Sequence, residues 1–199
     1  MSNDADMHEG SVPMLGRPEI AVLGSARLSE DDQRWRQAHE LGGLLAEAGF
    51  VIVTGGYGGL MAAVRRGAYE RDGFVIGLPM QHWSTITPNT WNADLRWSSD
   101  YGTRLNHLLR CAAVIALPGG IGTLSELAVV WAASQTEKQA QPLVLLGECW
   151  PPLIAAIRTN LVIGDSDLDL LRFAATPQEA VHEVQAGLRD TKHGQGPRG

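Results

Sequence analysis

Short apolar runs alternate with longer amphipathic stretches along most of this chain. Runs of four or five residues that are almost wholly apolar occur at 19–23, 50–53, 74–78, 113–117 and 143–146. Such runs are typical of β-strands that are buried on both faces. The stretches between them predict helices at about 30–48, 60–72 and 101–110, from the loop 118–122 to about 135, and from 177 onward.

Residues that favour helix ends support these boundaries. Ser29 is predicted to cap the first helix and Gly49 to end it, because a serine oxygen accepts a bond from a free amide and glycine tolerates the left-handed backbone of a helix end. Thr176 is predicted to cap the last helix, with Pro177 at the first helical position, where the missing N–H does no harm.

Strands that alternate with helices in this way predict an α/β fold, namely a doubly wound parallel sheet in a Rossmann-like three-layer sandwich. Right-handed crossovers favour the strand order 3-2-1-4-5, in which the chain reverses direction between its first and fourth strands. Ligands of such sheets bind at that reversal, outside the carboxyl ends of the strands. We therefore expect Gly24 and Ser25 to face residues 118–120 across one crevice.

The ends of the chain differ in composition from its middle. Residues 1–18 and 190–199 are polar and rich in glycine, proline and charge, so two flexible tails are expected around one nucleotide-binding domain at 19–189. The start of the chain is acidic and polar, which is unlike a signal peptide, and no apolar run is long enough to span a membrane. A cytoplasmic protein is expected.

Composition narrows the chemistry further. Lys138 and Lys192 are the only lysines among the 16 Lys and Arg residues, and both lie in polar stretches, which disfavours a Schiff-base enzyme. The net charge of −6 disfavours nucleic acid as a partner. Two cysteines, Cys111 and Cys149, and six scattered histidines have no metal-ligand spacing, so neither a metal nor a cofactor is expected.

The strongest chemical signal is the segment 117–126, LPGGIGTLSE, which joins an apolar run to an amphipathic stretch. Glycines let backbone amides approach an anion, and a helix N-terminus carries a partial positive charge. The segment therefore predicts a phosphate-binding loop. It is not a Walker loop, because no Gly-Lys-Ser/Thr follows.

A second glycine loop lies at 55–61, GGYGGLM. It fails as a dinucleotide fingerprint, because Met61 stands where the third glycine belongs and no acidic residue ends the third strand, so NAD is disfavoured. These glycines either contact a ligand or only make a tight turn that lets a helix pack on the sheet.

Taken together, the two loops resemble those of the LONELY GUY (LOG) family, the phosphoribohydrolases of cytokinin riboside 5′-monophosphates that were formerly described as lysine decarboxylases. Residues 117–126 match its PGGxGTxxE motif and residues 54–68, TGGYGGLMAAVRRGA, resemble its GGGxxGLM loop. The likeness covers roughly residues 19–160. It implies hydrolysis of a nucleoside 5′-monophosphate to a free base and ribose 5-phosphate, and a homodimer.

The resemblance also assigns residues. In that family the motif's final glutamate and an arginine on the preceding helix serve hydrolysis, which by position are Glu126 and Arg104. We expect Glu126 to stabilise the ribose cation and orient or deprotonate water, and Arg104 to polarise the leaving base or hold the water. The candidate phosphate- and nucleotide-binding residues are Gly119, Gly120, Gly122, Thr123, Gly24, Ser25, Gly56, Gly58, Gly59 and Met61.

The chain departs from the LOG pattern at two positions. Ser125 stands where members usually have a further acidic residue, and Leu105 follows Arg104 where they have lysine. The pattern from Arg104 to Arg110 is more similar to a neighbouring subgroup that includes molybdenum-cofactor carriers. A non-catalytic carrier of a phosphorylated cofactor such as molybdopterin is therefore the alternative function. A DNA-processing protein is a further one, because residues 24–27, GSAR, resemble the GSR turn of DprA-type domains.

Several site residues have alternative structural roles. Thr123 and Glu126 have capping-box spacing, in which the glutamate only reaches back to the cap's amide. Arg104 has Asp100 as an alternative partner. Ser25 is interpreted mainly as a turn residue, and Arg27 either as a counterion for the nucleotide or as a surface residue.

Two apolar features have alternative roles as well. The tryptophans of 82–97 (Trp83, Trp91 and Trp97) either stack a base or, more often in such loops, fill packing or an interface. The stripe of Leu124, Leu127, Val130 and Trp131 buries against the sheet or a neighbouring subunit.

Overall fold

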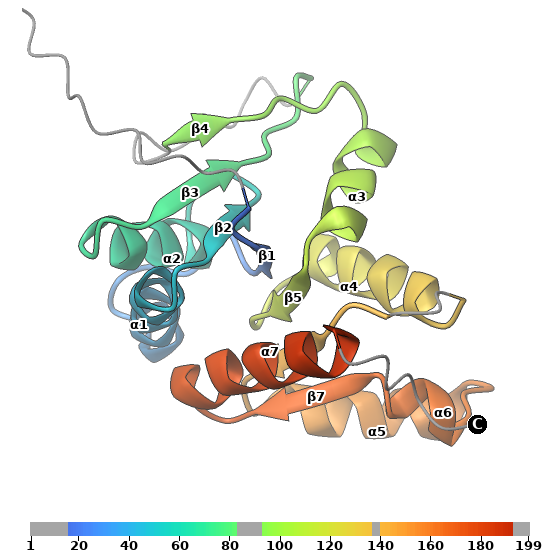
Figure 1. Ribbon diagram of the computed structural model, residues 1–199. Coiled ribbons are helices and arrows are strands. Elements are labelled where there is room, and N and C mark those ends of the chain that lie inside the picture. Colours follow the sequence, from blue (N-terminus) through green and yellow to red (C-terminus); the bar gives the residue numbers. More distant parts are fainter. Residues whose placement is uncertain (1–15, 83–92, 137–139, 193–199) are drawn as a thin grey trace, which may run out of the picture.

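The computed structural model describes residues 16–82, 93–136 and 140–192, and these form a sheet between two layers of helices (Figure 1). Seven parallel strands make up the sheet, in the order β4-β3-β2-β1-β5-β6-β7. Their bounds are β1 Glu19–Leu23, β2 Val51–Thr54, β3 Phe74–Gly77, β4 Asp94–Leu95, β5 Ala113–Ala116, β6 Leu143–Leu146 and β7 Leu171–Ala174.

The predicted fold class and strand order are both confirmed. The five strands expected from the apolar runs are β1, β2, β3, β5 and β6, and they pair in the predicted order with the reversal between β1 and β5. Two short edge strands extend this sheet. β4 pairs with β3 inside the segment that was expected to be irregular, and β7 pairs with β6.

Helices cover both faces of the sheet (Figure 1). They are α1 Gln33–Glu47, α2 Leu60–Tyr69, α3 Tyr101–Arg110, α4 Ile121–Ser134, α5 Trp150–Asn160, α6 Asp165–Leu168 and α7 Pro177–Lys192. In β1, Ile20 and Val22 pack in the core beneath α1, α2 and α7, whereas Ala21 and Leu23 pack in the core beneath α3, α4 and α5. Both faces of the strand are therefore buried, as its unbroken apolar run predicts.

The first helix begins later than expected, and Ser29 is not its cap. The backbone turns between Ser29 and Asp32, and Asp32 is extended, so the helix starts at Gln33 with the Asp32 carboxylate accepting from the Arg34 amide at 2.8 Å. Hydrogen bonds and the charge of Arg34 lower the pKa of Asp32 to about 2. The predicted end at Gly49 is confirmed, with φ +79° just after the helix.

The C-terminal third holds elements that the apolar pattern missed. α5 begins at Trp150 and accommodates Pro151 and Pro152 in its first turn. Thr176 caps α7 as predicted, accepting from the Glu179 amide at 3.2 Å, and the helix continues to Lys192.

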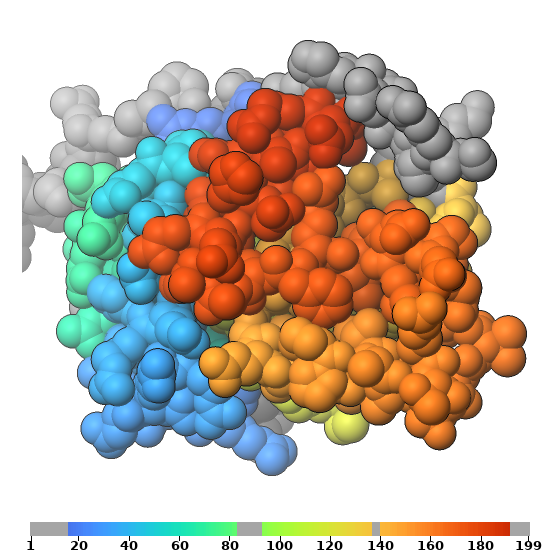
Figure 2. Space-filling view, turned by 90° about the horizontal axis from the view of Figure 1, so that it is seen from below, coloured from blue at the N-terminus to red at the C-terminus, as the bar shows by residue number. Residues whose placement is uncertain are grey.

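The space-filling view shows α7 beside α1 on one face of the molecule (Figure 2). Among the described helices, none has the length and apolar composition needed to cross a membrane.

Candidate functional site

A cavity of about 530 Å³ lies at the carboxyl end of the sheet, where the strand order reverses between the neighbouring strands β1 and β5. Eight of the predicted site residues line it, namely Gly24, Ser25, Met61, Arg104, Gly120, Gly122, Thr123 and Glu126. The other lining residues are Ala26, Arg27, Tyr57, Tyr101 and Ile121. Segments from four different parts of the chain therefore converge on one space, at the place where open α/β sheets bind ligands.

The loops after β1 and β5 are joined directly at this cavity. The Ser25 amide donates to the Pro118 carbonyl at 3.2 Å, so the two loops that were expected to face each other across the crevice are in contact. The Ser25 hydroxyl accepts from the Arg27 amide at 3.1 Å, which is the turn role expected for this serine. The same turn holds Arg27 at the cavity, where no described side chain forms an ion pair with it.

The start of α4 borders the cavity with a helix N-terminus that no side chain caps. Gly120 is the N-cap and has no side chain to bond the amides of the first turn. A Cβ at Gly120 or at Gly122 would meet no atom within 4 Å, so both positions open onto free space. Gly119 does not line the cavity. A Cβ there would lie 2.1 Å from the Thr123 hydroxyl, so its glycine is needed for packing inside the loop.

An ion pair between Arg104 of α3 and Glu126 of α4 is buried in the wall of the cavity. Nε and Nη2 of Arg104 both lie 2.8 Å from Oε1 of Glu126. The side chains are 6% and 8% exposed. Oε2 of Glu126 has no hydrogen-bond partner among the described residues. The pair therefore leaves one carboxylate oxygen available at the cavity.

Both N–H groups of Arg104 Nη1 are also used within the protein. Nη1 donates to the carbonyl of Leu78, at the end of β3, and to the carbonyl of Gly55 at 3.5 Å. The guanidinium therefore links α3, α4 and the loops after β2 and β3. This geometry orients Glu126, and it leaves Arg104 few donors with which to polarise a leaving base.

Two alternative interpretations of these side chains are wrong. Glu126 lies one turn beyond the N3 position of α4, because the helix starts at Ile121, so it does not form a capping box with Thr123. Asp100 is not the partner of the Arg104 side chain. It caps α3, and bonds from the Thr103 amide and hydroxyl and from Ser99 lower its pKa to about 2.

The second glycine loop serves mainly to position the first helix turn of α2. Gly56, Gly58 and Gly59 do not line the cavity. Gly56 and Gly59 have φ of +82° and +65°, which side chains rarely allow. Their glycines therefore make a tight turn, which was one of the two roles predicted for this loop. A Cβ at Gly59 would lie 2.2 Å from the Ser25 carbonyl oxygen, so this glycine lets α2 abut the loop after β1.

A buried arginine that sequence reasoning missed supports this loop. Arg65 of α2 is 0% exposed, and its Nη1 donates to the Gly56 carbonyl at 3.3 Å. Burial lowers the pKa of its guanidinium to about 10. The available signal was an arginine among the apolar positions of a predicted helix, because arginine is seldom fully buried unless it is paired.

Tyr101 was also missed as a cavity residue. It is the first residue of α3, and its hydroxyl lies 2.6 Å from the Ser125 hydroxyl. Ser125 is the position at which the LOG family has an acidic residue. A helix-forming pattern carries no signal for this contact, because it depends on how α3 and α4 pack.

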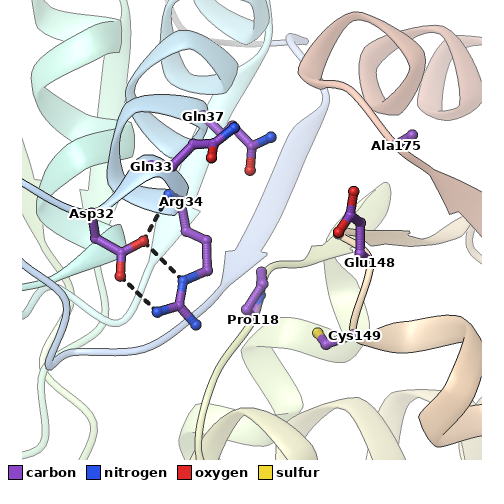
Figure 3. Close-up of a pocket in the computed structure, with 9 residues that line it drawn as sticks. Asp32, Gln33, Arg34, Gln37, Pro118, Glu148, Cys149 and Ala175 are labelled. Atoms are coloured by element: carbon purple, nitrogen blue, oxygen red, sulfur yellow. Dashed lines mark hydrogen bonds and ion pairs between the residues drawn. The ribbon is translucent and has the colours of Figure 1, made fainter.

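A second cavity of about 410 Å³ lies beside the first turns of α1 (Figure 3). Gln33, Gln37 and Glu148 extend toward it, while Arg34 is held by the Asp32 carboxylate at 2.6 Å. Pro118 lines this cavity, so the loop 118–122 borders both. The acidic and paired groups here make it less suitable for an anion than the first cavity.

The remaining predictions concern apolar residues and metals. Leu127 and Val130 are buried against the sheet, and Trp131 packs beside them and donates to the Asp167 carbonyl at 2.7 Å. Trp83 and Trp91 lie outside the described residues, and Trp97 does not line the cavity. Within the described ranges, no three His, Cys, Asp or Glu side chains are placed to hold a metal ion.

Comparison with known proteins identifies relatives of the whole domain. The SLOG cluster4 family matches residues 17–179. An uncharacterized protein of Archaeoglobus fulgidus is 30% identical over 130 residues, which are 64% of this chain and 83% of that protein.

Solved structures share the fold. The molybdenum cofactor carrier protein of Chlamydomonas reinhardtii is 27% identical, with a TM-score of 0.69 over 87% of this chain and 99% of the carrier. The molybdenum cofactor binding protein of Rippkaea orientalis is 23% identical, with a TM-score of 0.69 over 86% and 98%. DNA processing protein A of Helicobacter pylori shares the fold more distantly, at 16% identity and a TM-score of 0.54 over 85% and 80%. The likeness to the Chlamydomonas reinhardtii carrier agrees with the predicted resemblance to carrier-type proteins, and the other two structures show the shared fold alone.

Proposed function

The chain belongs to the SLOG cluster4 family, and we propose that it hydrolyses the N-glycosidic bond of a nucleoside 5′-monophosphate, giving a free base and ribose 5-phosphate. The observation that carries this proposal is the buried Arg104–Glu126 pair in the wall of the glycine-loop cavity. Burying two charges is costly, and apolar residues of similar size are often as stabilising. A pair that leaves one carboxylate oxygen at a cavity is better explained by chemistry there.

The phosphate is placed at the start of α4. The amides of Ile121, Gly122 and Thr123 have no helical acceptor by position, and Gly120 supplies no capping side chain. These donors and the helix dipole favour a phosphate monoester. Arg27 lines the same cavity and adds a positive charge that no described acidic side chain neutralises.

The reaction requires little else from the protein. Water adds to C1′ of the ribose, and the bond between C1′ and the base nitrogen breaks with its electron pair going to the base. The departing base takes up the proton that the water loses. Glu126, ionised beside the sugar, stabilises the oxocarbenium-like transition state and orients or deprotonates the water. Arg104 is a positioning residue, which holds Oε1 so that Oε2 faces the cavity.

The test is incubation of the full chain with a panel of nucleoside 5′-monophosphates, following both free base and ribose 5-phosphate. Release of the two products in equal amounts supports the proposal. Binding of the phosphate orients C1′ of the ribose for attack, and adenosine has no phosphate. Adenosine should therefore be turned over far more slowly than AMP. Equal turnover of AMP and adenosine would contradict the proposed site.

Gly120→Ala tests the phosphate position separately from folding. The added Cβ meets nothing in the protein and the backbone at φ −97° suits alanine, so only the poorer N-cap propensity of alanine should lower the free energy of unfolding, by about 1 kcal/mol or less. The methyl group occupies the space that the phosphate needs, so AMP affinity should fall by about tenfold or more. Thermal melting and calorimetric titration measure the two quantities, and unchanged AMP affinity would remove Gly120 from the site.

A carrier function is the second candidate, and one comparison favours it. The carrier of Chlamydomonas reinhardtii aligns with 87% of this chain at 27% identity. A carrier uses the same cavity to hold a phosphorylated, nucleotide-like cofactor such as molybdopterin and releases it unchanged. Nucleotide binding without any release of ribose 5-phosphate is the result that favours the carrier over the hydrolase.

A homodimer is proposed with α4 at its interface. Glu126 is the only charged residue of α4 and is buried, so the outer side of the helix presents Ile121, 80% exposed, together with Ala128 and Ala132. A helix face without charge is typical of a covered surface. Sedimentation velocity should show a dimer in the wild type and a monomer in Ala128→Glu; a monomeric wild type would contradict this proposal.

A further inference from the structure

Among the described residues, Tyr101 provides the one broad aromatic surface of the first cavity. Two aromatic side chains of the described chain line this space, Tyr57 and Tyr101. Tyr57 is 3% exposed and its hydroxyl accepts from the Met80 amide at 2.8 Å, so most of its ring is covered. Tyr101 is 36% exposed, so its ring is accessible to a ligand.

The ring of Tyr101 is also fixed in place. The Ser125 hydroxyl has one proton and donates it to the Gly122 carbonyl at 2.9 Å. The Tyr101 hydroxyl must therefore donate to the Ser125 oxygen, at 2.6 Å. One end of the side chain is held by the first turn of α3 and the other by the first turns of α4. Such a ring loses little further freedom when a ligand packs on it.

We infer that Tyr101 is a specificity-determining residue, against whose ring the planar heteroaromatic base of the ligand stacks. The site then selects phosphorylated ligands that carry a base-type ring over phosphorylated sugars that lack one. Stacking on an aromatic side chain tolerates different bases, because each has a π-face. The inference rests on the proposed phosphate position but not on hydrolysis. The base of a nucleotide substrate and the ring system of a carried cofactor can stack on the tyrosine in the same way.

The position of Ser125 gives this ring its support. A serine there accepts the tyrosine proton and passes its own to Gly122, whereas a carboxylate has no proton to donate to a carbonyl. The departure from the LOG motif at Ser125 thus belongs with Tyr101 as one hydrogen-bonded unit. Variants of the two residues are expected to behave differently, because only Tyr101 supplies the stacking surface.

The experiment compares ligands that differ only in the base. AMP, GMP and ribose 5-phosphate are titrated calorimetrically into the wild type, Tyr101→Ala, Tyr101→Phe and Ser125→Ala, each also in a Glu126→Gln background so that nucleotides stay intact. Tyr69→Ala is the matched control, because Tyr69 is 60% exposed on α2 and does not line the cavity.

Tyr101→Ala is expected to weaken AMP and GMP binding by about 5- to 150-fold and to leave ribose 5-phosphate binding unchanged. Tyr101→Phe keeps the ring and should stay within a few-fold of the wild type, as should Ser125→Ala and the control. Equal losses for nucleotides and ribose 5-phosphate, a Tyr101→Phe protein as weak as Tyr101→Ala, or no nucleotide binding by the wild type would overturn the inference. A wild type that binds nucleotides in this pattern but releases no ribose 5-phosphate overturns the hydrolase proposal and supports the inference.

Discussion

Replacing Glu126 by glutamine is expected to lower the release of ribose 5-phosphate by about 10²–10⁴-fold, because the amide neither stabilises a developing ribose cation nor takes a proton from water. The affinity for AMP should change little, since the carboxylate acts mainly in the transition state. The loss should therefore fall on kcat rather than on KM. Product release by the variant, measured with single nucleotides at saturation, gives the ratio directly.

Glutamine is preferred to alanine because of the buried partner. Glu126→Ala leaves the guanidinium of Arg104 without its acceptor in a buried site, which costs about 3–5 kcal/mol. Glutamine retains an oxygen that accepts from Nε. A lower activity together with an unchanged melting temperature then reports on chemistry and not on folding.

Glu148→Gln is the matched control for this change. Glu148 is exposed and lines the second cavity, so the same substitution there removes the same charge from another part of the surface. It should leave product release unchanged. Full activity in Glu126→Gln, or an equal loss in Glu148→Gln, would remove Glu126 from the proposed mechanism.

The strand order was predictable because each central strand is an almost wholly apolar run. β1, β2, β5 and β6 lie in the middle of a parallel sheet, where both faces are covered and nearly every position must be apolar. Edge strands lack this constraint. β7 combines the partly exposed Arg172 with Phe173, which is 45% exposed, and so it has no apolar run to detect.

The two charged residues of the site were predictable one at a time but not as a pair. Their contact depends on how α3 and α4 cross, and 22 positions separate them in the sequence. Local rules instead offered each residue a nearer partner, Asp100 for Arg104 and the helix cap for Glu126. The cap alternative failed because α4 begins two residues before Thr123, which moves Glu126 into the second turn and toward Arg104. The Asp100 alternative failed because that carboxylate caps α3.

The roles of the individual glycines were the hardest to predict from the sequence, because glycine serves three different purposes in these loops. Gly120 and Gly122 open onto the cavity, Gly119 makes room for Thr123, and Gly56 and Gly59 adopt positive φ. Only the first kind is suited to contact a ligand. The motif therefore located the cavity but overstated how many of its glycines line it.

Gly59→Ala is expected to destabilise the fold by about 3 kcal/mol, although this residue does not line the cavity. Alanine at φ +65° and ψ −137°, a backbone conformation almost confined to glycine, costs about 1–3 kcal/mol, and its Cβ would lie 2.2 Å from the backbone oxygen of Ser25. The backbone of Ser25 and Ala26 must move to relieve this clash. For a chain of 199 residues we expect a melting temperature lower by about 6–12 °C.

The displacement also reaches the cavity, because Ser25 and Ala26 line it and the Leu60 amide bonds the Ser25 carbonyl at 2.8 Å. AMP affinity should therefore fall together with stability. Gly58→Ala is the neighbouring control: its Cβ would meet only the Ala26 oxygen, at 3.6 Å, and the residue has no positive φ, so its stability should change by less than about 0.5 kcal/mol. Equal melting temperatures for the two variants would show that the close contact between Gly59 and the loop after β1 does not require glycine. The alternative, in which the glycines of this second loop contact the ligand, would then be favoured.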